Sequence, residues 1–148
     1  MLDKMKMIWQ DAKQLKDERG LTLVELLVVV VILGIIAAIA VVAIGGIIEN
    51  SKKDAMVADA KQMVSAAKLH TASNPEAASL DFTKEVGQSY ISKLNDPFGD
   101  EYSKALVTIT PDGNKYSYSV QLVGKKAIGA STPVAESAIN KDAIVDTE

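Results

Sequence analysis

The chain has 148 residues, no cysteine and a formal net charge of -3. The lack of cysteine excludes disulfides, thiolate catalysis and cysteine metal sites, and the scattered basic residues predict no nucleic-acid stripe. His70 is the only histidine, and neither a G-x-S-x-G motif nor a phosphate-binding glycine loop is present. We therefore expect a protein that is not an enzyme and uses no metal or other cofactor, with DNA left open as a partner.

Residues 1–20, MLDKMKMIWQDAKQLKDERG, contain five basic and four acidic side chains and come directly before an apolar run. Basic residues in front of a membrane span favour a cytoplasmic N-terminus. The pattern thus predicts that residues 1–20 stay in the cytoplasm and that the C-terminal part of the chain is exported.

The 23 residues from Leu26 to Ile48 include no charged or strongly polar side chain. As a helix they would span about 35 Å, which is enough to cross a bilayer core. Hydrophobicity alone would make this run an ordinary membrane anchor. A secretory signal cut after Ala38-Ile39-Ala40 is a further alternative, but eight more apolar residues follow, beyond a usual signal core.

Residues 49–72 change to a one-sided pattern, which predicts that the same helix leaves the membrane and packs one face on its own head. We expect one helix from Leu21 to about Ala72, most flexible at Gly45 and Gly46, ending at Asn74 because proline follows. The apolar stripe has helical spacing. Its members are Met56, Ala60, Met63, Val64, Ala67 and Thr71.

The remaining residues predict a small head. A short helical stretch is expected over 82–94, followed by a turn in NDPFGDEY, residues 95–102. The carboxylates of Asp96, Asp100 and Glu101 do not follow EF-hand spacing, so we expect a solvated turn and not a calcium site. His70 is expected to serve at a surface or helix end.

A β-hairpin is predicted around PDGN, between ALVTIT (105–110) and KYSYSVQLV (115–123). In the second strand, two tyrosines, a valine and a leucine alternate with polar residues, so we expect the apolar face on the helix. Ser117, Ser119 and Gln121 are expected in water. From about Gly129 the chain reads as a loose tail or a short final strand.

Glu25 lies at the start of the apolar run, where an ionised side chain costs about a few kcal/mol or more unless it has a partner. No cation lies between Glu25 and Lys52, and Arg19 is six residues away, off helical neighbour spacing. A cut after Gly20 would give Leu21 a free ammonium group. That group could pair across one turn, or with Glu25 of a neighbouring helix, which would set an assembly register.

The segment RGLTLVELLVVVVILGIIAAIA resembles the N-terminal signature of type IV pilins and type II secretion pseudopilins. The resemblance implies that prepilin peptidase cuts between Gly20 and Leu21 and that the Leu21 amine is N-methylated. It implies that Glu25 pairs with the amine of a neighbouring subunit, and Gly34 matches the helix glycine of the family.

Two positions depart from the family pattern. Leu21 replaces the usual first phenylalanine, a change that the peptidase is expected to accept. Val42 stands where many relatives carry a helix-kinking proline, so the helix is expected to be straighter, or to melt at Gly45 and Gly46 in a filament. The head also lacks the terminal cysteine pair of Gram-negative pilins, which favours a Gram-positive source.

The resemblance and the elements together predict an α+β, pilin-like fold, with a long N-terminal helix on a small C-terminal antiparallel sheet. We expect a leader (1–20), a transmembrane and filament-core helix (21–48), an amphipathic half (49–72) and a head (73–148). Close helix packing in the core is expected at Gly34, Ala37, Ala38 and Ala40.

The expected function is a prepilin that starts as a single-pass protein of the cytoplasmic membrane and ends in a surface filament for adhesion, motility or DNA uptake. The expected partners are other copies of the chain, the prepilin peptidase and methyltransferase, the membrane assembly platform and other pilins. A secretion pseudopilin and a lone membrane-anchored binding domain are the alternatives.

Overall fold

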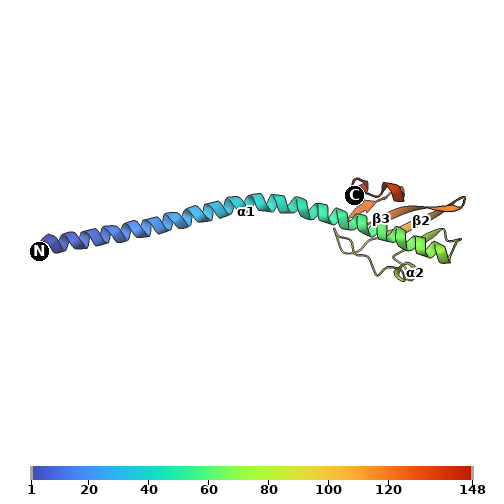
Figure 1. Ribbon diagram of the computed structural model, residues 1–148, viewed down its shortest axis with the longest axis horizontal. Coiled ribbons are helices and arrows are strands. Elements are labelled where there is room, and N and C mark those ends of the chain that lie inside the picture. Colours follow the sequence, from blue (N-terminus) through green and yellow to red (C-terminus); the bar gives the residue numbers. More distant parts are fainter. Residues whose placement is uncertain (1, 148) are drawn as a thin grey trace. The chain divides into compact units, whose positions relative to one another are not determined.

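The computed structural model describes residues 2–147, without the side chains of residues 11–20. The chain divides into two compact units, Met1–Ile47 and Ile48–Glu148. In its described residues the first unit is entirely helical. The second contains the end of the same helix, a sheet and several short elements (Figure 1).

Helix α1 comprises 72 residues, Leu2–Ser73. It ends where predicted, because the backbone N–H of Asn74 donates to the carbonyl of His70 at 2.8 Å and Pro75 follows. Its start differs from the expected Leu21, since residues 2–20 are also helical. These residues are rich in helix-forming Lys, Gln, Leu and Met and contain no proline, which explains the earlier start.

The second unit contains a six-stranded antiparallel sheet in the order β1-β2-β3-β4-β6, with β5 also paired to β3. Figure 1 shows β2 and β3 alongside the last part of α1. The α+β fold expected from the sequence is therefore confirmed. The strands are β1 (Ser79–Asp81), β2 (Lys104–Asp112), β3 (Lys115–Val123), β4 (Lys126–Ile128), β5 (Val134–Ala135) and β6 (Ile144–Asp146).

The predicted hairpin is present as β2 and β3. Asp112 pairs with Lys115, so the turn has two residues, Gly113 and Asn114. Gly113 has φ +61°, whereas none of the non-glycine residues from 2 to 147 has a positive φ. Glycine with positive φ at the first turn position is typical of a type II′ turn, whose twist matches that of the strands.

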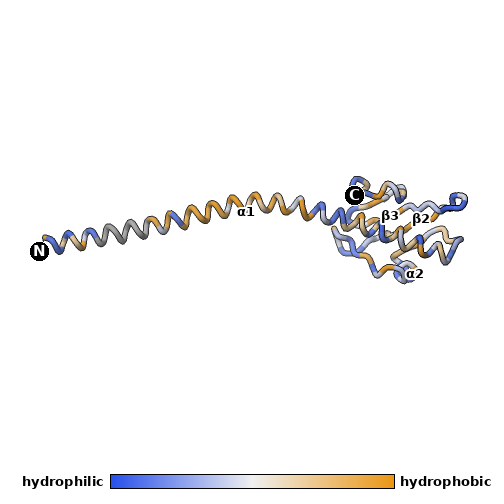
Figure 2. The backbone as a smooth tube through the Cα atoms, viewed as in Figure 1, coloured by the Kyte–Doolittle hydropathy of each residue, from blue (hydrophilic) through white to orange (hydrophobic). Residues whose placement is uncertain are grey.

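The core lies between one face of α1 and the inner face of the sheet. The predicted helix stripe is confirmed, since Met56, Ala60, Met63 and Ala67 have no exposed surface and Val64 and Thr71 are nearly buried. The facing strand residues include Val107, Val120 and Leu122, all fully buried. Figure 2 shows the apolar run of α1 before this packed part and the mixed hydropathy within it.

The helix expected over 82–94 is wrong for most of its length. Only α2, Glu85–Gln88, is helical, and β1 precedes it. The Asp81 carboxylate accepts hydrogen bonds from the Thr83 N–H and hydroxyl at 2.9 and 2.6 Å, which starts a turn. A Cβ on Gly87 would lie 2.3 Å from the Asp81 carbonyl oxygen, so α2 packs closely against the end of β1 and requires glycine there.

The expectation that Gln121 faces water is also wrong. Its side chain is only 8% exposed, and Nε2 donates to the Gly129 carbonyl at 3.2 Å. Gln121 is covered by residues 129–147, which we call the C-terminal segment. In this segment β5 pairs with β3, and β6 pairs with β4. Of the two alternatives for residues after Gly129, the loose tail is therefore excluded for the described residues. At the hairpin end Tyr116 is exposed, contrary to the expected inward face.

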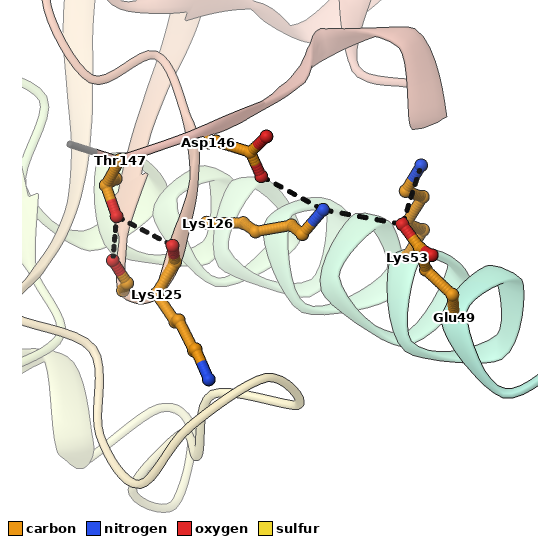
Figure 3. A network of polar contacts seen from close by, with 7 residues as sticks. Glu49, Lys53, Lys125, Lys126, Asp146 and Thr147 are labelled. Carbon is orange, nitrogen blue, oxygen red and sulfur yellow. Dashed lines mark hydrogen bonds and ion pairs between the residues drawn. The ribbon is translucent and has the colours of Figure 1, made fainter. Parts of the chain in front are cut away.

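Ion pairs attach β4 and the C-terminal segment to α1. Lys141 Nζ lies 2.9 Å from Asp54 Oδ1. Lys126 Nζ joins Glu49 of α1, at 3.5 Å, to Asp146 of β6, at 3.1 Å (Figure 3). Each exposed pair contributes about 1 kcal/mol or less, so the segment depends on several together. A further pair, Lys68 of α1 with Glu136, lies at 2.5 Å.

We predict that Met63→Ala lowers the free energy of unfolding of the head by about 2–5 kcal/mol, because it leaves a cavity between helix and sheet. Guanidinium unfolding of the detergent-solubilised chain, followed by the absorbance of the four head tyrosines, would measure the change. Met7→Ala is the matched control, since Met7 is 66% exposed. Equal effects of both substitutions would contradict this packing.

Candidate functional site

The apolar half of α1 has no cover in the first unit. From residue 21 to residue 48 every side chain is exposed except that of Ala40, which is half-buried. Within the described residues, this is one helix long and apolar enough to cross a membrane. A soluble monomer rarely exposes so large an apolar surface, so this half requires lipid or other helices around it.

Glu25 is exposed in this apolar surface, and its carboxylate has no ion pair with any described residue. Leu21 lies one helical turn before it, which is about 6 Å along the axis, and is 62% exposed. In the intact chain the Leu21 nitrogen is an uncharged amide. The side-chain surroundings of Gly20 lie outside the described residues.

The small residues of the apolar half leave room for a close neighbour. A Cβ added at Gly34, Gly45 or Gly46 would meet no atom within 4 Å. Gly34 and Ala38 are four residues apart and therefore share a helix face, with Ala37 beside them. The helix continues unbroken through Gly45 and Gly46.

A protein-family model described as the prokaryotic N-terminal methylation motif matches residues 15–41. The chain carries the type IV pilin and pseudopilin signature. The pilin signature contains Gly20, Leu21 and Glu25 and ends within the apolar half of α1. It does not extend into the head, and no curated protein or solved structure matches the chain significantly.

Beyond the pilin signature, Asp96 connects two loops of the head. Oδ1 accepts from the Phe98 N–H at 2.9 Å, and Oδ2 accepts from the Lys125 N–H at 2.7 Å. A Cβ on Gly124 would lie 2.2 Å from Oδ2, so glycine is needed there. Because Asp96 is only 4% exposed, the expectation of a solvated turn is wrong at this residue.

The other carboxylates of that turn differ from Asp96. Asp100 and Glu101 are exposed, and Glu101 pairs with Lys93 at 2.5 Å. Among the described residues, no group of three or more His, Cys, Asp or Glu side chains could hold a metal ion. Through the two hydrogen bonds of Asp96, the turn connects two loops of the head.

His70 lies at the end of α1, as expected from its position. Its Nδ1 is 3.1 Å from the Tyr90 hydroxyl, and the two rings meet edge to face. The Phe98 ring lies near two lysines, with the Nζ atoms of Lys52 in α1 and Lys126 in β4 at 5.8 and 5.2 Å from its centroid. These contacts position the head on α1, and no sequence motif identified them.

Asp59 and Tyr102 form a hydrogen-bonded pair in the head, and the pKa values of both groups are raised. The Tyr102 hydroxyl donates to Asp59 Oδ2 at 2.9 Å. Burial raises the pKa of Asp59 above its usual value, Asp96 adds to this, and the tyrosine hydrogen bond opposes it. Burial, together with the nearby Asp59 charge, also raises the pKa of Tyr102.

We predict that the free energy of unfolding of Asp59→Asn, measured relative to wild type, increases as pH rises from below 3.8 to neutral. The raised pKa means that the folded state holds the Asp59 proton more tightly than the unfolded state, so wild type loses stability as this carboxyl ionises. Asparagine cannot ionise and can still accept the tyrosine hydrogen bond.

Guanidinium unfolding of both chains at a series of pH values would measure this difference. Other carboxyls titrate in both proteins and largely cancel. A stability difference that is independent of pH would contradict the assignment.

Proposed function

We propose that this chain is a prepilin, the structural subunit of a type IV pilus or pilus-like surface filament. The supporting observation is a methylation motif on an uncovered apolar helix, with a carboxylate one turn after the expected cut that has no ion pair among the described residues. In this proposal the chain is inserted in the cytoplasmic membrane and cut between Gly20 and Leu21. It is methylated on the new amine and then polymerised through α1.

The apolar half of α1 would have two successive environments. In the membrane its backbone polar groups are satisfied within the helix, and lipid surrounds its side chains. In a filament the neighbouring helices replace lipid and keep this surface from water, which is worth about 25 cal/mol per Å². Close approach at Gly34, Ala37, Ala38 and Ala40 would add dispersion contacts, as in membrane helix pairs.

Glu25 would select the correct alignment of neighbouring helices. The new Leu21 amine of one subunit would lie beside Glu25 of another only when the helices are offset along their axes. A misaligned helix would leave a charge unpaired in an apolar environment, which is strongly unfavourable. The same pair would neutralise both charges and set the register of growth.

The proposed partners are other copies of the chain, the prepilin peptidase and methyltransferase, an assembly platform in the membrane and other pilins. Before assembly the N-terminus would be cytoplasmic, and after assembly the head would form the surface of the fibre. We propose adhesion, motility or DNA uptake as the task of the fibre.

A secretion pseudopilin is the second candidate, because the same signature occurs in pseudopilins. Long surface fibres containing the chain support the pilus subunit. Loss of exoprotein release after deletion of its gene supports the pseudopilin. A mature protein that still begins at Met1 would instead indicate a membrane-anchored domain without assembly.

We predict that Glu25→Gln leaves membrane insertion intact and lowers fibre yield by about tenfold or more, because an unpaired amine in an apolar contact costs a few kcal/mol. The glutamine retains the side-chain volume and removes only the charge. Sheared surface fraction and membrane fraction would be compared by mass spectrometry. Wild-type fibre yield from this variant would contradict the pairing.

We predict that Gly20→Val blocks processing, because a branched side chain replaces the glycine at the expected cut. The N-terminal peptide of the membrane pool would then begin at Met1, whereas the wild-type mature chain begins at Leu21 with a methylated amine. Intact-mass measurement detects both changes. Normal processing of the variant would place the cut elsewhere.

A further inference from the structure

The first turns of α1 carry an exposed apolar face on the N-terminal side of the expected cut. Four large side chains form it and are between 67% and 76% exposed. Successive residues of a helix are rotated by about 100°, so these four fall within an arc of about 120°. An apolar arc of this width is typical of a helix that lies against another surface. We call it the leader face, formed by Leu2, Met5, Ile8 and Trp9.

Charged residues are ordered around the leader face. By the same helical geometry Lys4 and Lys6 flank it, each about 40° beyond one edge, and Asp3 falls on the opposite side of the helix. Lysines beside an apolar face can keep their methylene stems in apolar surroundings while the ammonium groups reach phosphates. This order of apolar, basic and acidic residues is typical of a helix that lies in the plane of a lipid surface.

The same spacing continues in the sequence after residue 10. Ala12 and Leu15 follow Ile8 at steps of four and three, and Lys13 follows Lys6 by seven residues. The side chains of these later residues lie outside the described part of the chain, so the extension is a property of the sequence. It doubles the length over which one face stays apolar.

A lipid surface is the partner that lies within reach of every copy of the leader face. In the proposed function Leu21 begins the membrane span, so the preceding residues start at the cytoplasmic boundary of the bilayer. A straight helix along the membrane normal would carry Trp9 about 18 Å away from Leu21 and into water. A turn at Gly20 would instead bring the leader face to the boundary between headgroups and acyl chains, where tryptophan is favoured. Tethering favours this contact over a separate protein partner, which has to be encountered.

We infer that residues 2–19 lie as a helix in the cytoplasmic surface of the membrane, with the leader face among the acyl chains and the lysines on anionic phospholipid headgroups. This inference rests on the membrane insertion in the proposed function. The helix would open at Gly20, the only glycine before Gly34 and the weakest helix former in that stretch. The expected cut is then held at the lipid surface.

The fluorescence of Trp9 tests the inference, because Trp9 is the only tryptophan of the chain. The full uncut chain would be placed in nanodiscs of phosphatidylcholine and phosphatidylglycerol. Quenching would be measured with a lipid that carries a nitroxide near its headgroup, and separately with acrylamide in the water. We expect clear lipid quenching, and acrylamide quenching at least about twofold weaker than that of free N-acetyltryptophanamide. Full acrylamide quenching without lipid quenching would overturn the inference.

Met5→Glu and Met7→Glu are a matched pair of variants. Both methionines are exposed in the same helix, at 69% and 66%, but Met7 lies outside the leader face. We expect Met5→Glu to raise acrylamide quenching of Trp9 about twofold and to abolish lipid quenching, because a carboxylate would have to enter the apolar boundary. Met7→Glu should match wild type. Acrylamide is uncharged, so the new carboxylate does not itself attract or repel it. Equal quenching of the two variants would contradict the proposed face.

Two further outcomes separate the alternatives. Nanodiscs of phosphatidylcholine alone should give weaker lipid quenching, and no change would refute the contact of the lysines with anionic headgroups. Protection of Trp9 from acrylamide without any lipid quenching would indicate a protein contact and overturn the inference. These measurements need neither processing nor assembly. Absence of surface fibres from cells would therefore refute the proposed function and leave the quenching results unchanged.

Discussion

The two halves of helix α1 need different surroundings, and the other features of the molecule depend on this difference. Along its second half α1 buries a single stripe against the sheet, whereas residues 21–48 are not covered by any described part of the chain. The backbone hydrogen bonds of a helix are internal, so the uncovered half is stable in lipid or among other helices. Water is the one environment in which it is strongly disfavoured.

Several kinds of contact hold the head on this helix. Apolar side chains supply the main contact, and β4 and the C-terminal segment add ion pairs along the helix from Glu49 to Lys68. Asp96 joins the turn before β2 to the turn after β3 through backbone hydrogen bonds. A pull on the helix would therefore be distributed over many small contacts and not borne by one.

The long elements were predictable because they repeat a pattern. The helix stripe at Met56 and Met63 and the hairpin at Gly113 combine sustained periodicity with a specific turn residue. The methylation motif likewise depends on adjacent residues, which is why its recognition was confirmed. The roles of individual residues such as Glu25 stay predictions.

The short elements could not be predicted in the same way. Strands β1, β4, β5 and β6 have two or three residues each, too few to show a period. Gln121 is buried only because the C-terminal segment returns to it, and Asp96 is buried only because Gly124 leaves space for it. Such contacts join segments that are distant in sequence, so no local pattern reports them.

The unbroken course of α1 from Leu2 to Ser73 bears on the proposed cut between Gly20 and Leu21. The expected scissile bond lies within regular helix, where backbone N–H and C=O groups are already engaged with each other. A protease that binds its substrate as an extended strand must first unwind about one turn of the helix. Glycine at this point lowers the free-energy cost of unwinding. Local unwinding would then be a step that the processing enzyme has to drive before hydrolysis begins.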